Sequence, residues 1–168
     1  MYKQILLNSI IREMKIIRRL STKIPKDKVD FRKKEGMRST LELLQYLSSC
    51  GTGMLLFWYR TDNSDFKTFY TTLNEKSKTV TLENFASRMD EQIELVTKIF
   101  ENITEEDLLN KEVDFPSGDK GPLAQGIIEN NIKWLTAYKM QLFLALKLTV
   151  EEKLTTADLW RKTEIEMA

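Results

Sequence analysis

Few residues of this chain could act as catalysts or metal ligands, because the chain contains no histidine and a single cysteine. Histidine-based acid–base catalysis is therefore excluded. The thiol of Cys50 could act as a nucleophile only if a base or a positive charge beside it lowered its pKa. No histidine can take that part, and the sequence alone does not assign a lysine or arginine neighbour to the thiol. We expect Cys50 to be a buried, unreactive side chain, with a nucleophilic role as the alternative.

Carboxylates at helical spacing are the other candidates for chemistry. In the segment "DEQIE", Asp90, Glu91 and Glu94 could place two acids on one helical face. Di-metal sites in helical bundles need matching acids on the facing helices. Only Glu42 and Glu129 are obvious candidates, and each is better interpreted as a capping or surface residue. We expect a solvated acidic face and no metal site.

Four segments with helical hydrophobic periodicity must position these residues. They cover residues 2–20, 38–59, 82–102 and 122–150. In the second segment, Ser39 and Glu42 have the spacing of a capping box, and in the third Thr81 is the expected N-cap. The "CGTG" stretch weakens the second helix, since each glycine costs up to about 1 kcal/mol relative to alanine. We nevertheless expect that helix to be continuous.

The connections between these segments suggest one domain covering residues 1–168. The polar stretch 60–80 is long enough to cross one end of a helical bundle, with at most a short turn at residues 65–70. The tail from about residue 151 is expected to be peripheral and to pack through Leu159 and Trp160. The sequence thus predicts an all-α fold, a four-helix bundle with one long crossover between the second and third helices.

Charge is unevenly distributed along the chain. Between Arg12 and Arg38, eleven basic residues stand against four acidic ones, a local balance of +7. Such a segment could bind nucleic acid, but it is better interpreted as a solvated helix face and a charged loop. We find no membrane-spanning run and no secretory signal, and the single cysteine cannot form an internal disulfide. A cytoplasmic protein is expected, with neither nucleic acid nor membrane as a partner.

Two stretches carry a resemblance to a known family. They are "GMRSTLELLQYLSS", residues 36–49, and "NNIKWLTAYKMQLFLALK", residues 130–147. Together and in this order they resemble the DinB/YfiT-like superfamily of four-helix bundles, which includes metal-dependent hydrolases and thiol-dependent transferases. The resemblance implies a metal bound by one histidine of the second helix and two histidines of the fourth, four residues apart.

The positions that correspond to those ligands hold aromatic residues in this chain. The resemblance places the first ligand at Tyr46 and the other two at Trp134 and Tyr138, and it leaves only Gln141 of the polar signature. Indole has no lone pair to donate, and a phenol with a pKa near 10 is a poor ligand for zinc at neutral pH. We therefore expect no metal and no other cofactor.

The aromatic positions could still form a binding site. Cys50 follows Tyr46 by four residues and shares its helical face. An aromatic box with such polar groups could bind a small planar or amphipathic ligand, or the same side chains could simply fill the space.

We expect a DinB-like protein that has lost the metal site and acts as a small-ligand-binding or interaction protein, with a homodimer as a possible assembly. The alternatives are a hydrolase or thiol-dependent transferase with a rearranged site, and a nucleic-acid-associated protein that uses residues 12–38.

Overall fold

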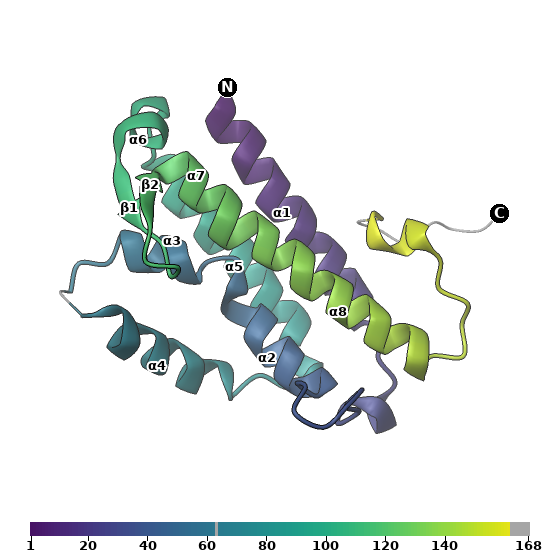
Figure 1. Cartoon of the computed structure of the whole chain (residues 1–168). Helices are drawn as coiled ribbons and strands as arrows, with labels where there is room; N and C mark the ends of the chain where they lie inside the picture. Colours follow the sequence, from purple (N-terminus) through teal and green to yellow (C-terminus); the bar gives the residue numbers. More distant parts are fainter. Residues whose placement is uncertain (63, 162–168) are drawn as a thin grey trace.

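The computed structural model describes residues 1–62 and 64–161, and it is mostly helical (Figure 1). The helices are α1 (Tyr2–Ser21), η1 (Lys26–Lys28), α2 (Thr40–Cys50), α3 (Gly53–Trp58), α4 (Phe66–Ser77), α5 (Leu82–Glu101), α6 (Glu105–Asn110), α7 (Leu123–Ile127), η2 (Ile128–Ile132), α8 (Lys133–Thr149) and η3 (Thr156–Leu159). Two short strands, β1 (Glu112–Asp114) and β2 (Lys120–Pro122), form an antiparallel hairpin. The predicted all-α class is confirmed.

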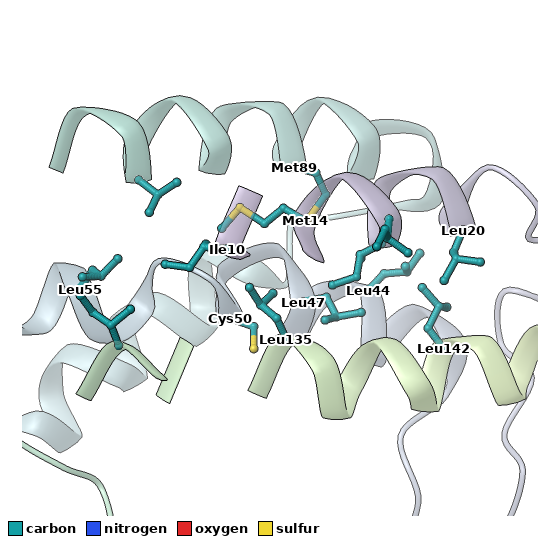
Figure 2. Close-up of a cluster of buried hydrophobic side chains, with 14 of the residues drawn as sticks. Ile10, Met14, Leu20, Leu44, Leu47, Cys50, Leu55, Met89, Leu135 and Leu142 are labelled. Carbon is teal, nitrogen blue, oxygen red and sulfur yellow. The ribbon is translucent and has the colours of Figure 1, made fainter. Parts of the chain in front are cut away.

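The long helices α1, α2, α5 and α8 surround a common core. Helix α1 packs against α5 and α8, and α2 packs against the same two helices. Figure 2 shows buried side chains from these helices and from α3 meeting at the centre: Ile10, Met14, Leu20, Leu44, Leu47, Cys50, Leu55, Met89, Leu135 and Leu142. Leucine, isoleucine and methionine side chains recur every three or four residues on each helix, so each helix presents one apolar stripe to this core.

The second predicted helix begins as expected but does not continue as expected. The Ser39 hydroxyl accepts from the Glu42 N–H at 3.2 Å, and the Glu42 carboxylate accepts from the Ser39 N–H at 2.7 Å, which completes the capping box. The prediction of a continuous helix was wrong, because α2 ends at Cys50 and α3 begins at Gly53.

Close packing explains the glycine at position 51, where the two helices meet. A Cβ atom at this position would lie 2.1 Å from Cε of Met14, and the Gly51 carbonyl accepts a hydrogen bond from Nδ2 of Asn131 at 2.9 Å. The interruption therefore lets α1 approach closely and gives a buried amide on η2 a backbone partner.

The crossover between α2 and α5 contains a helix where the sequence predicted only a short turn. Helix α4 has twelve residues and is capped by Asp65, whose carboxylate accepts from the Thr68 N–H at 2.9 Å. It lies against α2 and α3. Helix α5 begins as predicted, because Thr81 and Asn84 form a capping box at its start.

The fourth predicted helix is one uninterrupted helical segment with a change of winding. Its first turns, α7, run into the π-helical segment η2, and α8 continues from there. The β1–β2 hairpin packs beside α7. A π-helical turn holds more residues than an α-helical one and is frequently found at functional sites.

Residues 150–161, here called the C-terminal strap, turn back from the end of α8 (Figure 1). Leu154 and Leu159 are buried, whereas Trp160 keeps 51% of its surface exposed. The predicted contact through Leu159 is confirmed, and Leu154 adds a second apolar anchor. In the part of the chain that the structure describes, no helix is both long enough and apolar enough to cross a membrane.

Candidate functional site

Tyr46 and Tyr138, two of the positions that the resemblance assigned to one site, lie next to each other. Tyr46 lies on α2 and Tyr138 on α8, and their ring centroids are 4.4 Å apart with an angle of 51° between the planes. Both side chains are partly buried and pack against the hydrophobic core. A tilted contact at this separation is favourable for two aromatic rings. The position that the resemblance assigns to a metal is therefore occupied by two phenol rings in tilted contact.

Arg38 covers this pair from the loop that precedes α2. Its guanidinium carbon lies 4.4 Å from the centroid of Tyr46 and 5.4 Å from that of Tyr138. The side chain is exposed, so one face of the guanidinium contacts the rings while its N–H groups can reach solvent or a ligand. Sequence reasoning missed this role of Arg38.

Cys50 lies one turn beyond Tyr46 and keeps 6% of its surface exposed. Burial raises the pKa of its thiol to about 12, and the charge of Arg38 only partly opposes this. Burial also raises the pKa of Tyr46, and the neighbouring Cys50 and Tyr138 add to the shift. The thiol and this phenol are therefore neutral at physiological pH, and Arg38 supplies the positive charge of the cluster.

Helix α4 contributes a third phenol that sequence reasoning missed. Burial raises the pKa of Tyr70, and Cys50 raises it further. The Tyr70 hydroxyl would lie 3.1 Å from a Cβ atom built on Gly53, so the glycine makes room for this ring at the start of α3. A signal was present, because Phe66, Tyr70 and Leu73 recur at helical spacing in the segment interpreted as a linker.

Trp134 and Gln141, the remaining predicted site residues, lie on α8 on either side of Tyr138. Trp134 packs partly against the core and also lines a cleft of about 530 Å³ together with Phe115 and Asn130. Gln141 is partly buried, and within residues 1–62 and 64–161 no hydrogen bond joins it to Tyr46 or Tyr138. The cluster described from here on comprises Arg38, Tyr46, Cys50, Tyr70 and Tyr138 and is called the tyrosine cluster.

Four of the five acids considered as metal ligands, all except Glu94, have a basic partner among the described residues. Their shortest N···O distances are 2.8 Å for Asp90 with Arg18, 2.8 Å for Glu91 with Arg88, 2.9 Å for Glu42 with Arg32 and 2.6 Å for Glu129 with Lys133. Among the described residues, no three side chains of the types His, Cys, Asp or Glu lie together as a metal site would require. These acids act in ion pairs and helix caps.

A second polar cluster, not foreseen from the sequence, lies on the other side of α8. Lys139 is 1% exposed, and its Nζ lies 2.7 Å from Oε2 of Glu13 on α1. The Thr136 hydroxyl lies 3.3 Å from the same carboxylate oxygen, and the Lys139 ammonium stands 4.5 Å from the ring centroid of Trp160. The α1, α8 and strap members of this cluster are far apart in the sequence, so no local sequence pattern could predict the cluster.

Comparison with known proteins adds no assignment: no family model matches the chain, and neither curated proteins nor solved structures yielded a match. The function has to be argued from the site itself.

Proposed function

We propose that the chain is a divergent DinB-like four-helix bundle in which the tyrosine cluster replaces the metal site. Two observations support the fold part of this proposal. Helices α1, α2, α5 and α8 pack as neighbours around one core, and the long connection falls between α2 and α5. Tyr46 and Tyr138 also face each other, as two positions of a shared site must.

The function that the geometry supports best is reversible binding of a small planar or amphipathic ligand with an anionic or hydrogen-bond-accepting group. The observation that carries this proposal is the guanidinium of Arg38 stacked on Tyr46 and Tyr138. A guanidinium held against rings keeps its N–H donors in one plane, which suits a carboxylate or a similar planar acceptor. The aromatic rings would contact the apolar part of the same ligand.

A catalytic role for Cys50 receives no support from its surroundings. The thiolate is the nucleophilic form, and burial raises the pKa of this thiol to about 12. The ionisable side chains that interact electrostatically with this thiol are the phenols of Tyr46 and Tyr70 and the guanidinium of Arg38. None of these groups acts as a base at neutral pH. We therefore propose a binding protein rather than a thiol-dependent transferase or a hydrolase with a rearranged site.

Nucleic-acid binding through residues 12–38 is also less well supported. Several cations of this segment are already paired within the protein: Arg18 with Asp90, Arg19 with Asp158, Lys23 with Glu152 and Arg32 with Glu42. Phosphate contacts would have to compete with these ion pairs.

Three benzene derivatives of similar size test the proposal. Benzoate carries a planar anion, benzamidine a planar cation, and benzyl alcohol no charge. We expect the protein to bind benzoate more tightly than the other two, measured by ligand-detected NMR. Arg38→Gln should weaken benzoate binding about tenfold or more, because a hydrogen bond to a charged group contributes about 1.5–3 kcal/mol.

The matched control is Lys34→Gln, which removes one positive charge from the same loop, where Lys34 is exposed. It should leave benzoate binding within about twofold of the parent, because exposed charges are strongly screened by solvent. Equal binding of benzoate and benzamidine, or equal losses in the Arg38 and Lys34 variants, would contradict the proposed site.

A further inference from the structure

The C-terminal strap is attached to the rest of the protein through a small number of strong contacts. Leu154 and Leu159 are its buried apolar anchors. Asp158, also buried at 7% exposure, faces Arg19 on α1. Asp158 also closes a capping box around η3, since its carboxylate accepts from the Thr155 N–H at 2.8 Å. The strap therefore has a local fold of its own that presents Leu159 and the Asp158 carboxylate to α1.

The surface that receives the strap carries three cations, one of which, Lys139, is paired with Glu13. Nη1 of Arg19 lies 3.7 Å from Oδ1 of Asp158, and its other guanidinium nitrogens donate to the backbone carbonyls of Asp158 and, at 3.0 Å, Arg161. Nη2 of Arg12 lies 3.5 Å from the carbonyl of Trp160. With the Lys139 ammonium near the indole of Trp160, three cations from α1 and α8 converge on the strap. We call Arg12, Arg19 and Lys139 the strap-binding surface.

The link between α8 and the anchored part of the strap is exposed to solvent, unlike the buried anchors. Glu151, Glu152 and Lys153 are exposed. An ion pair of 3.0 Å joins Glu152 to Lys23 at the surface, and such pairs contribute little to stability. The segment thus consists of a solvent-exposed link followed by a compact docking element.

From this arrangement we infer that the strap-binding surface also accepts the strap of a second copy of this chain, giving a strap-exchanged homodimer. The occupant is defined by the contacts above: an acidic residue followed by leucine and tryptophan, held by Arg19 and Lys139. Every copy of the chain carries that segment as Asp158, Leu159 and Trp160.

Mass action decides between the two arrangements. The exchanged dimer makes the same strap contacts as the monomer, so the docking contacts cancel in the comparison. A short tether gives the attached strap an effective concentration of about 1 mM. The monomer therefore dominates in dilute solution. Exchange becomes favourable when a strap binds the surface of its own chain more weakly than it binds the surface of another chain.

A pair of charge-reversed full-length variants creates that condition. Arg19→Glu damages the surface and keeps an intact strap, whereas Asp158→Arg damages the strap and keeps an intact surface. In each variant alone, like charges oppose docking. In a mixture, the strap of the first variant meets its natural surface on the second, and the reversed pair is complementary as well.

We expect each variant alone to be monomeric at about 0.1 mM, because neither carries a matched strap and surface, and the parent to be monomeric because this concentration lies below the effective concentration of its tethered strap. The equimolar mixture should contain a heterodimer of twice the 19.7 kDa chain mass, measured by light scattering and by native mass spectrometry. The double variant Arg19→Glu/Asp158→Arg is the control for charge: it restores opposite charges within one chain and should remain monomeric, although it lacks the Asp158 cap of η3 and the Arg19 hydrogen bonds to the strap.

A mixture that remains monomeric, although circular dichroism shows both variants folded, would overturn the inference. If Arg19→Glu does not fold, a fluorescent peptide of residues 153–161 replaces it and is titrated against full-length Asp158→Arg. Binding at least tenfold tighter than that of a scrambled peptide supports the docking site. Equal binding of the two peptides refutes it.

Discussion

The two sides of α8 bury different kinds of polar group: neutral side chains on one side and an ion pair on the other. Tyr138 faces α2 and meets Tyr46 in a cluster whose thiol is neutral. Lys139, the next residue, faces α1 and forms an ion pair with Glu13 beneath Trp160. Consecutive residues of an α-helix point about 100° apart, so one helix presents a neutral aromatic surface and a buried charged one.

The difference shows what each arrangement demands of its surroundings. Neutral phenols can lie at a partly open surface, where either a ring or water satisfies them. A buried ammonium and carboxylate must be close together and well shielded, because each loses its hydration on burial. The strap side therefore depends on its charged partners for stability, whereas the tyrosine side has freedom to exchange partners, which is a useful property for a binding site.

The largest effect should come from breaking the buried ion pair. Lys139→Met leaves the Glu13 carboxylate buried without its counter-ion, and we expect a loss of about 3–5 kcal/mol in the free energy of unfolding. Urea denaturation followed by circular dichroism measures it. Lys133→Met is the matched control, since it removes an exposed ion pair with Glu129 and should cost less than about 1 kcal/mol.

The double variant Glu13→Leu/Lys139→Met tests the same explanation from the other side. Replacing both ions with apolar residues of similar size should recover most of the lost stability. If the double variant were as unstable as Lys139→Met, the loss would arise from poor packing of methionine rather than from the unpaired carboxylate.

Alkaline pH should destabilise the tyrosine side through its thiol. The folded protein keeps the Cys50 proton up to a pKa of about 12, whereas the unfolded chain releases it near the ordinary value of 9.0. Unfolding stability should thus decrease as the pH rises from about 9 toward 12, by up to about 1.4 kcal/mol per pH unit for this group.

The variant Cys50→Ala isolates that contribution. Urea denaturation at pH 7 and pH 10, with a reducing agent present, should show a smaller loss of stability in Cys50→Ala than in the parent. The raised pKa values of Tyr46 and Tyr70 act in the same direction but at higher pH, because a phenol ordinarily ionises near 10. Identical losses in the two proteins would mean that the thiol is not buried as the structure shows.

A smaller effect is expected from Tyr138→Leu. This change keeps an apolar side chain on α8 but removes the ring contacts with Tyr46 and Arg38, and aromatic pairs contribute about 0.5–1.5 kcal/mol beyond the area that they bury. We expect a loss in that range by urea denaturation. A loss as large as that of Lys139→Met would show that Tyr138 is part of the core rather than of an adaptable surface.

The smallest effect concerns the strap at acid pH. Burial tends to raise the pKa of Asp158, but its hydrogen bonds to Thr155 and the charge of Arg19 outweigh burial and lower the pKa below the ordinary 3.8. The contribution of this carboxylate to strap attachment is therefore present above about pH 4 and is lost as the pH falls below it.

Trp160 can report that loss, because its indole lies in the strap. We expect a change of its fluorescence below pH 4 in a Trp58→Phe/Trp134→Phe background, before the circular dichroism signal of the helices changes. Asp158→Asn in the same background should show the altered fluorescence already at neutral pH. Simultaneous changes of fluorescence and circular dichroism would indicate that the strap is not a separate element.

Local sequence patterns were sufficient for the main helices and their starts. The Ser39–Glu42 and Thr81 caps could be predicted because a cap depends on residues only three positions apart. The pairing of Tyr46 with Tyr138 followed from a resemblance and from helical spacing. Helix α4 was missed because threonine, lysine and asparagine surround its apolar residues and gave the segment the composition of a linker.

Features that depend on distant residues could not be predicted in this way. The need for glycine at position 51 comes from the approach of Met14 on α1, and the Glu13–Lys139 ion pair joins residues separated by more than a hundred positions. The approach of Tyr70 to Gly53 depends on where α4 lies. In each case the relevant neighbour is set by tertiary packing and leaves no local pattern.

The π-helical turn η2 fixes which residue of α8 faces which partner. Its wider winding holds one residue more than a regular helix would hold in the same rotation. If residues 128–132 were wound as a regular helix, every side chain of α8 would advance by about 100°. Tyr138 would then point toward Glu13, Ala137 would point toward Tyr46, and neither cluster could form. The single extra residue in this turn thus determines the direction in which every side chain of α8 points.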